Sequence, residues 1–469
     1  MHECRTQNAE CRNSVNKRFC ILHFAFCIAA AILAGCSTIR SPPSLSTTID
    51  RIAAEPPLDR AIWGILVTDD AGRALYSRNA HTLLVPASNR KLFSASSAID
   101  CFPLDHRFTT ELLLDGSNLV LRGGGDPSLG GRWAFERDKD FAPFIDALRS
   151  RGVMSVADII ADVSRFDRVT EPPSWKIGYM SGGDISPVDA LAYNENVVGV
   201  FVESCAKPVV DTDPLFVPAR VTGIVCGAGE PDVLSDATNS LTVEGTLSDR
   251  YQALTSVNDP PLYAAQALRD ALRHGGIEVR GALRVERTPG FQTAEKLAEI
   301  DSPFFVQLLM VMLKNSQNLY AEMLFKGTAD PPSSYERAED LERAFLTADV
   351  GLDPSEFRFV DGSGLSPDDL VTPAAIVHLL RWMNEPARRG LFWSVLATPG
   401  EEGTLRRRLL PLADRLRAKT GTLRGVNALS GILAGAHGRY RYFSILINHH
   451  TAESATRAID DMVTAIADF

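Results

Sequence analysis

Residues 86–99 read PASNRKLFSASSAI and predict the start of a helix, because apolar side chains recur at near-helical spacing from Leu92 to Ile99. Three positions are almost one helical turn, so Ser88 and Lys91 project from the same face. A buried lysine can lose its proton and act as the base for a serine hydroxyl. The helix N-terminus also places the Ser88 N–H where it can stabilise an oxyanion. Alone, Ser-x-x-Lys is more typical of a helix cap beside a solvated lysine.

A second short motif, Ser316-Gln317-Asn318, follows an apolar stretch at 305–313 that predicts another helix. A hydroxyl and a carboxamide two positions apart on a turn can reach into one cleft. Ser316 can relay a proton between Lys91 and a leaving amine, while Asn318 holds a substrate amide close to Lys91. By itself, Ser-x-Asn is also typical of a simple turn or helix start.

The third motif, Lys419-Thr420-Gly421-Thr422, is predicted to lie on a strand edge. Gly421 lets a substrate backbone lie close to the strand. Lys419 and the two threonine hydroxyls form a donor-rich rim suited to a terminal carboxylate. The backbone N–H of Thr422 is the expected second oxyanion donor. An isolated Lys-Thr-Gly is also compatible with a surface turn.

The order of the motifs gives them their weight, because Ser-x-x-Lys, Ser-x-Asn and Lys-Thr-Gly in this order are typical of β-lactamases and penicillin-binding proteins. The chain resembles the class C low-molecular-mass penicillin-binding proteins, which are D-alanyl-D-alanine carboxypeptidases and endopeptidases with a large inserted domain. More than twice as many residues separate Ser88 from Ser316 as separate Ser316 from Lys419, as such an insertion requires.

Other stretches are similar to the same family, and they lie at 123–127, 193–196, 318–322, 361–366 and 403–405. Pro367, Asp368 and Asp369 depart from the family, which has a basic or amide residue there, and the departure is expected to alter the rim of the cleft.

The resemblance implies an acyl-enzyme mechanism on peptidoglycan stem peptides. Ser88 attacks the carbonyl of the penultimate D-alanine, Lys91 takes its proton, and Ser316 passes a proton to the departing D-alanine. Asn318 belongs to the same catalytic group, and residues 419–422 bind the substrate. β-Lactams are expected inhibitors, and no cofactor is implied. A serine β-lactamase and a non-catalytic peptidoglycan-binding lipoprotein are the alternatives, and the balance of carboxypeptidase and endopeptidase activity stays open.

Both ends of the chain predict strands of one sheet. The expected elements are hairpin strands at 62–68 and 74–77, later strands at 416–419, 428–434 and 440–448, and a last helix at 452–467. We therefore expect an α/β (α+β) fold, with a β-lactamase/transpeptidase-like domain over 59–105 and 290–469 whose antiparallel sheet is flanked by helices. The glycine- and proline-rich stretch 106–289 is expected to be an inserted β-rich domain.

The N-terminal residues predict an exported protein. A basic pair precedes an apolar run that ends in LAGC at 33–36, a pattern that resembles bacterial lipoprotein signals. We expect a signal peptide over 1–35, a lipid on Cys36 and a tether over 36–58. Ser37 resembles the residue that follows the lipidated cysteine in outer-membrane lipoproteins, so the expected location is the periplasm, on the outer rather than the inner membrane. A plain signal peptide or a short membrane anchor is the alternative.

Composition bounds the function further. The 469 residues carry a formal net charge of −10. This charge argues against nucleic acid as a partner, because binding of its phosphates depends on an excess of Lys and Arg. Export favours oxidation, so Cys205 and Cys226 are expected to form a disulfide, which leaves Cys101 as a buried free thiol. No Cys-x-x-Cys spacing or histidine cluster occurs, so no metal is expected.

Overall fold

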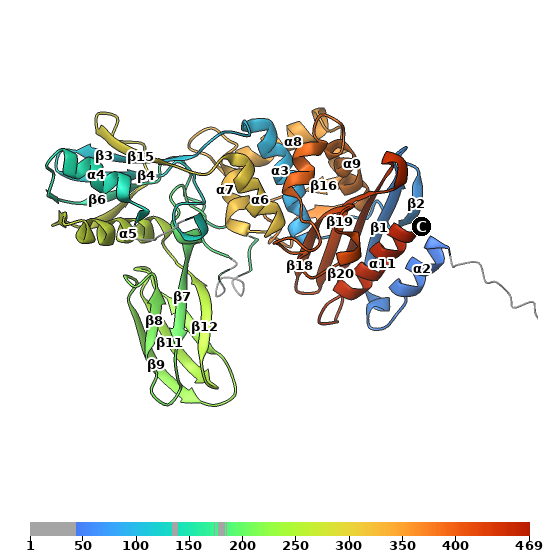
Figure 1. Ribbon diagram of the computed structural model, residues 1–469, viewed down its shortest axis with the longest axis horizontal. Helices are drawn as coiled ribbons and strands as arrows, with labels where there is room; N and C mark the ends of the chain where they lie inside the picture. The colour runs from blue at the N-terminus through green and yellow to red at the C-terminus, as the bar shows by residue number, and fades with distance from the viewer. Residues whose placement is uncertain (1–43, 134–138, 173, 177–182, 184) are drawn as a thin grey trace, which may run out of the picture.

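The computed structural model describes residues 44–133, 139–172, 174–176, 183 and 185–469 (Figure 1). The expected signal peptide, the expected lipid on Cys36 and the first part of the expected tether lie outside these residues. The helices are α2 (Leu45–Ala53), α3 (Lys91–Cys101), α4 (Ala142–Ser150), α5 (Pro260–His274), α6 (Phe305–Lys314), α7 (Asn318–Lys326), α8 (Tyr335–Ala348), α9 (Pro373–Met383), α10 (Arg389–Val395) and α11 (Thr456–Asp468). In this part of the chain, no helix combines the length and the apolar character needed to cross a membrane.

A five-stranded sheet joins the two ends of the chain, in the order β18-β19-β20-β1-β2. Its strands are β1 (Ile62–Asp69), β2 (Ala74–Arg78), β18 (Leu416–Leu423), β19 (Val426–Ala434) and β20 (Tyr440–Asn448). All neighbouring strands are antiparallel, and Ile65 lies opposite Ile445 where the first hairpin meets the last strands. The expected antiparallel sheet built from both ends of the chain is confirmed.

Helices cover both faces of this sheet (Figure 1). Alternate side chains of β20 enter two different cores, because neighbours along a strand point to opposite faces. Phe443 and Ile445 are buried in a core that includes α2 and α11. Tyr442 and Leu446 are buried in a core that includes α3, α6 and α9. The sheet is thus the middle layer of three.

The expected tether is wrong for Leu45–Ala53, which form α2. Leu45, Ile49 and Ile52 are spaced by four and three residues, so they form one apolar stripe, and this stripe is buried in the core shared with α11. Ser44 caps the helix by accepting a hydrogen bond from the Thr47 N–H. The serine-, threonine- and proline-rich composition obscured the stripe in the sequence.

We call the unit built on the sheet of β1, β2 and β18 to β20, with its covering helices, the first unit. The segment between its two halves in the chain contains a second, mixed five-stranded sheet. In spatial order its strands are β14 (Leu283–Glu286), β6 (Ile159–Asp162), β4 (Asn118–Arg122), β3 (Thr109–Asp115) and β15 (Glu295–Asp301). The expected boundary at residue 289 falls before β15, which pairs with β3 so that Ile300 lies opposite Thr110. We therefore propose that the inserted unit spans 106–301.

Smaller sheets complete the architecture. Their strands are β7 (Val197–Val202) with β8 (Val210–Asp213) and β12 (Tyr251–Ser256); β9 (Ala219–Cys226) with β10 (Pro231–Ser235) and β11 (Leu241–Leu247); β5 (Ser155–Val156) with β13 (Glu278–Val279); and β16 (Phe357–Arg358) with β17 (Leu370–Val371). The first two sheets project away from the rest of the molecule (Figure 1, green). Within this projection Cys205 and Cys226 form a disulfide with their Cα atoms 5.1 Å apart.

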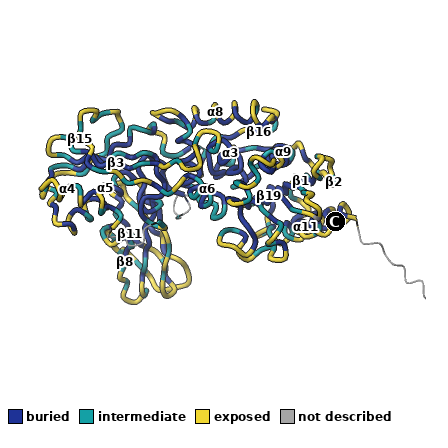
Figure 2. Tube along the Cα trace, turned by 45° about the horizontal axis from the view of Figure 1, so that its top comes forward, coloured by how far each residue is buried: buried dark blue, intermediate teal, exposed yellow. Residues whose placement is uncertain are grey.

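The inserted unit packs on the first unit as well as being joined to it by the chain. Leu319 and Met323 of α7 are buried in the same core as Leu129 and Leu191 of the inserted unit. Figure 2 shows buried residues in α3, α6 and β3 and exposed residues along the loops of the projecting sheets.

Cys101 is exposed, so the expectation that it is buried is wrong. It is the last residue of α3, whose buried positions run from Lys91 to Ala98. The helix has left the core by the time the chain reaches Cys101.

Candidate active site

Ser88 lies in a short 3-10 turn, Ala87–Arg90, that leads directly into α3. Ala87 has a φ of 48°, which lies in the left-handed region. This conformation is energetically unfavourable for a residue that has a side chain. Gly364 packs against this turn, and a Cβ at Gly364 would lie 2.0 Å from the Ala87 carbonyl oxygen. The strained backbone is therefore fixed by a close neighbour, as is common where a side chain is held for function.

Lys91 connects the first two motifs. Its Nζ lies 3.1 Å from Ser88 Oγ. The same Nζ donates to Asn318 Oδ1 at 2.6 Å and to the Ser363 carbonyl oxygen at 2.8 Å. Ser88, Lys91 and Asn318 therefore form one hydrogen-bonded group, although the second motif lies far from the first in the sequence.

Burial lowers the pKa of Lys91 to about 7, against the attraction of the Glu322 and Asp361 carboxyl groups, which favours the charged form. A lysine with a pKa near 7 is partly neutral at physiological pH. Its nitrogen can then accept the proton of the Ser88 hydroxyl, which lies within hydrogen-bond distance.

Ser316 and Lys419 form a second pair. Ser316 lies between the end of α6 and the start of α7 with a φ of 63°, and its Oγ accepts a hydrogen bond of 2.7 Å from Lys419 Nζ. Burial and the charge of Lys91 hold the pKa of Lys419 well below its usual range. A negative group of a ligand near Lys419 would raise that pKa and favour the charged form.

The third motif lies on β18, whose edge runs past the turn that carries Ser88. A Cβ at Gly421 would lie 2.8 Å from the Pro86 carbonyl oxygen and 2.9 Å from Asn89 Nδ2, so only glycine fits this approach. Lys419 and Thr420 are buried, whereas Thr422 is exposed. Thr422 Oγ1 accepts a hydrogen bond of 3.2 Å from Asn427 Nδ2.

Glu322 was not among the expected site residues, although it holds the acceptor of Lys91 in place. Its buried carboxylate accepts hydrogen bonds from the Gly362 N–H at 2.9 Å and the Ser363 N–H at 2.8 Å. Both stretches, 318–322 and 361–366, are similar to the family in the sequence. Their pairing could not be read from the sequence, because the contact joins positions about 40 residues apart in different elements.

Arg90, inside the first motif, anchors the turn that carries Ser88 to α8. Its guanidinium makes two parallel hydrogen bonds of 2.7 and 2.8 Å to the buried Glu342 carboxylate. Arg90 Nε donates to the Asp361 carbonyl oxygen at 2.8 Å. The Asp361 carboxylate in turn accepts a hydrogen bond of 2.9 Å from Trp175 Nε1 of the inserted unit.

Of the three residues that depart from the family at 367–369, Asp369 lies in this buried network. Asp369 is fully buried and accepts a hydrogen bond of 2.8 Å from the Val360 N–H. Burial and the nearby Asp361 raise the pKa of Asp369 well above its usual range. Only Asp368 of the three is exposed.

Glu195 of the inserted unit contacts the second motif. Gln317 Nε2 donates to Glu195 Oε2 at 2.9 Å, and the Tyr320 hydroxyl donates to Glu195 Oε1 at 3.3 Å. Glu195 also pairs with Arg132. Glu195 lies among consecutive residues with left-handed backbone, since Asn194, Glu195 and Asn196 have φ values of 50°, 55° and 57°. The inserted unit thus supports the residue between Ser316 and Asn318.

These contacts define what the site can do chemically. A serine hydroxyl lies beside a buried lysine that can be neutral, which is the requirement for nucleophilic attack on a carbonyl. A second serine and a second lysine lie in the same site and can pass a proton or attract a carboxylate. The arrangement suits acyl transfer to a serine.

Comparisons with known proteins agree with this chemistry. A model of the D-Ala-D-Ala carboxypeptidase 3 (S13) family matches residues 45–468. The D-alanyl-D-alanine carboxypeptidase of Actinomadura sp. (strain R39) is 30% identical to this chain, over 91% of this chain and 85% of that protein. The D-alanyl-D-alanine carboxypeptidase DacB of Haemophilus influenzae is 27% identical, over 81% of this chain and 84% of that protein.

The fold is similar to solved structures. The crystal structure of penicillin-binding protein 4 (dacB) from Haemophilus influenzae superimposes with a TM-score of 0.80 at 23% identity, over 90% of this chain and 98% of that chain. A predatory peptidoglycan endopeptidase from Bdellovibrio bacteriovorus superimposes with a TM-score of 0.52 at 15% identity, over 87% of this chain and 93% of that chain. The penicillin-binding-protein fold expected from the sequence is confirmed.

Proposed function

Because this chain belongs to the D-Ala-D-Ala carboxypeptidase 3 (S13) family, we propose that Ser88 is the nucleophile with which it cleaves the D-alanyl-D-alanine end of peptidoglycan stem peptides. The protein is a penicillin-binding serine carboxypeptidase/endopeptidase, and its family acts on the cell wall outside the cytoplasm. The observation that carries the assignment of Ser88 is its 3.1 Å distance from the buried Lys91 Nζ.

Acylation begins with transfer of the Ser88 proton to neutral Lys91 as Oγ attacks the carbonyl of the penultimate D-alanine. The negative charge on the carbonyl oxygen is stabilised by the backbone N–H groups of Ser88 and Thr422. Close approach of β18 to the Ser88 turn, which Gly421 permits, supports this pair of donors.

Departure of D-alanine requires a proton on its amine. Ser316 is suited to relay to this amine the proton that Lys91 took from Ser88, because its hydroxyl is hydrogen-bonded to Lys419 and belongs to the same site as Lys91. Lys419, with Thr420 beside it, attracts the terminal carboxylate of the substrate, and Asn318 keeps Lys91 in position. Water then hydrolyses the Ser88 ester. The same steps cleave a cross-link when the leaving amine belongs to a second stem peptide.

We also propose that the protein is a periplasmic lipoprotein, attached to the outer membrane through Cys36. The support is the LAGC sequence at 33–36 followed by Ser37. Cells that express the full chain and are fed a labelled fatty acid should label the wild-type protein but not Cys36→Ala. Label on both proteins, or on neither, would exclude the anchor.

The experiment that tests the catalytic assignment is incubation of the chain from Ser37 onward with a labelled penicillin, followed by mass spectrometry of the peptides. A stable adduct on Ser88, together with D-alanine release that Ser88→Ala abolishes, is the expected result. Rapid turnover of the drug would indicate a β-lactamase. Absence of both adduct and turnover would indicate a non-catalytic wall-binding protein.

A further inference from the structure

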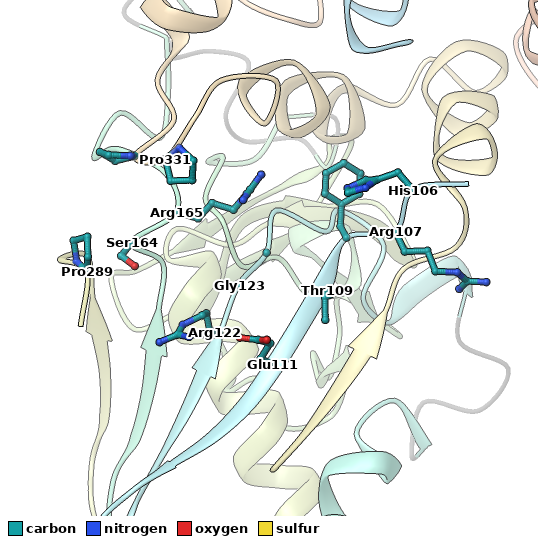
Figure 3. Close-up of a pocket in the computed structure, with 13 residues that line it drawn as sticks. His106, Arg107, Thr109, Glu111, Arg122, Gly123, Ser164, Arg165, Pro289 and Pro331 are labelled. Carbon is teal, nitrogen blue, oxygen red and sulfur yellow. Dashed lines mark hydrogen bonds and ion pairs between the residues drawn. The ribbon is translucent and has the colours of Figure 1, made fainter. Parts of the chain in front are cut away.

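A cavity of about 450 Å³ lies where the mixed sheet of the inserted unit meets the loop after α7 (Figure 3). Its walls come from His106–Thr109 before and within β3, from the end of β4, from Ser164 and Arg165 after β6, and from Pro331 and Pro332. None of the motif residues lines it. Its size is in the range of sites for small ligands.

The walls of this cavity are held firmly. A Cβ at Gly124 would lie 2.1 Å from the Thr109 carbonyl oxygen. The backbone at Gly124 is therefore already packed against the backbone at Thr109. A hydrogen bond of 2.8 Å from the Ser333 N–H to the Arg165 carbonyl oxygen joins the two units next to the cavity, because Arg165 lines it and Ser333 follows Pro332 of its wall. An open space between such walls stays available to a ligand.

One side of the cavity has its charges satisfied internally. Arg122 donates to Asp162 at 2.8 Å and lies 3.5 Å from Glu111. Glu111 also pairs with Lys296 at 2.8 Å. Because these charges are paired with one another, this cluster is expected to attract a charged ligand only weakly.

Arg165 differs from this cluster. Its Nε is buried without a hydrogen-bond partner, and no carboxylate in the described ranges from 44 to 469 forms an ion pair with it. Burial alone shifts the pKa of its guanidinium, downward, with no opposing charge. A partly buried cation without a partner is costly, and an incoming anion would remove that cost.

The surroundings of Arg165 favour an anion attached to an apolar group. In Figure 3 the Arg165 side chain extends from the side of Pro331 toward His106. The ring of His106 stacks on Phe102 and meets Phe108 edge-on, and burial together with Arg165 lowers the pKa of His106. Near neutral pH His106 is therefore an aromatic wall rather than a competing cation.

We propose that this cavity binds a free carboxylate of a peptidoglycan stem peptide other than the one in the catalytic site, with Arg165 as its anchor. The proposal rests on the proposed function, since the polymer that the enzyme cleaves supplies the ligand. A guanidinium binds a carboxylate through two parallel hydrogen bonds, and the proline and aromatic walls suit the alanine side chain next to it. Two contacts on one polymer increase the effective concentration of the cleavable peptide.

The test compares two substrates for the full chain: insoluble peptidoglycan and a soluble synthetic peptide that ends in D-alanyl-D-alanine. Arg165→Gln should lower D-alanine release from the polymer by about tenfold, and leave kcat/KM for the soluble peptide within about twofold. The matched control is Arg168→Gln, an exposed arginine three residues along the same segment, which should leave both rates unchanged.

Equal rates on the polymer for Arg165→Gln and wild type would overturn the proposal. So would a loss of soluble-peptide turnover or of penicillin acylation in Arg165→Gln, since that loss would assign Arg165 a structural role. Inorganic phosphate should slow wild type on the polymer but not Arg165→Gln. Phosphate binding that depends on Arg165 while polymer rates stay equal would assign the cavity to free phosphate instead. If wild type forms no penicillin adduct and releases no D-alanine, the proposed function itself fails.

Discussion

At the scale of single residues, the proposed chemistry of the site depends on the burial of Lys91. Removal from water lowers its pKa to about 7, although carboxyl groups lie nearby. A surface lysine at the same spacing from a serine would stay charged and could not act as a base. The difference between a helix cap and a nucleophile is therefore made by burial, which the Ser-x-x-Lys pattern does not encode.

The acylation rate should depend on pH through Lys91. Its neutral form is the competent one, so the second-order rate constant for penicillin acylation should rise as pH increases through about 7 and level off above it. Stopped-flow acylation between about pH 5 and pH 9, roughly two units either side of that pKa, measures this. Lys91→Arg, which cannot lose its proton, should be slower by about 1000-fold. A rate independent of pH would contradict the role of Lys91.

Gly421 makes a second prediction at this scale. Gly421→Ala places a Cβ 2.8 Å from the Pro86 carbonyl oxygen, which forces β18 away from the Ser88 turn. Penicillin acylation should slow by about tenfold because the donor at Thr422 moves. The control is Gly390→Ala, where a Cβ meets nothing within 4 Å. Equal acylation rates for the two variants would show that the approach of β18 is not needed.

At the scale of elements, the sequence predicted the central sheet well and the edges of the units poorly. The expected strand at 440–448 has the bounds of β20, because a turn containing Gly438 precedes a run rich in β-prone residues. Helix α2 was missed because its polar composition outweighed a short apolar stripe. β15 was missed as part of the inserted unit because its partner, β3, is far away in the sequence.

The candidate site divides in the same way. Pro86 to Lys91, Ser316 to Asn318 and the 419–422 stretch could be read from the sequence because each is a local pattern with a chemical meaning. The ion pair of Arg90 with Glu342 could not be predicted from the sequence, because a buried pair depends on which elements pack together. Asp369 was expected at the rim of the cleft but is buried, because its position too depends on which elements pack together.

The packing of α2 leads to a stability prediction. Ile49 is fully buried between α2 and α11, so Ile49→Ala should lower the free energy of unfolding by about 3 kcal/mol through lost contacts and a cavity. Arg51→Ala is the control, since its ion pair with Glu55 is exposed and worth about 0.5 kcal/mol at most. Urea unfolding followed by tryptophan fluorescence measures both. An equal decrease in the free energy of unfolding for the two variants would show that Leu45–Ala53 do not contribute to the core and act as a tether.

At the scale of the whole molecule, we expect that the chemistry of the first unit does not depend on the projecting sheets. The Cys205–Cys226 disulfide lies in the projection, whereas the Ser88 turn is held by α8 and by the 361–366 segment. Replacing both cysteines by serine should therefore increase proteolytic cleavage between residues 197 and 256 while penicillin acylation stays within about twofold of wild type. Limited proteolysis and acylation of the same samples test this. A large loss of acylation would show that the projection supports the site.

The pairing of β1 with β20 also has a consequence for biosynthesis. When β1 and β2 emerge from the ribosome, they form only an isolated hairpin, which is marginally stable by itself. Three of the five strands, β18, β19 and β20, are synthesised last, and Lys419 is carried by the first of them. The inserted unit, by contrast, has its own sheet, whose strands all precede β18 in the chain. A chain that stops before β18 lacks Lys419 and three of the five strands of this sheet, so truncated products of interrupted synthesis are expected to be inactive even after export.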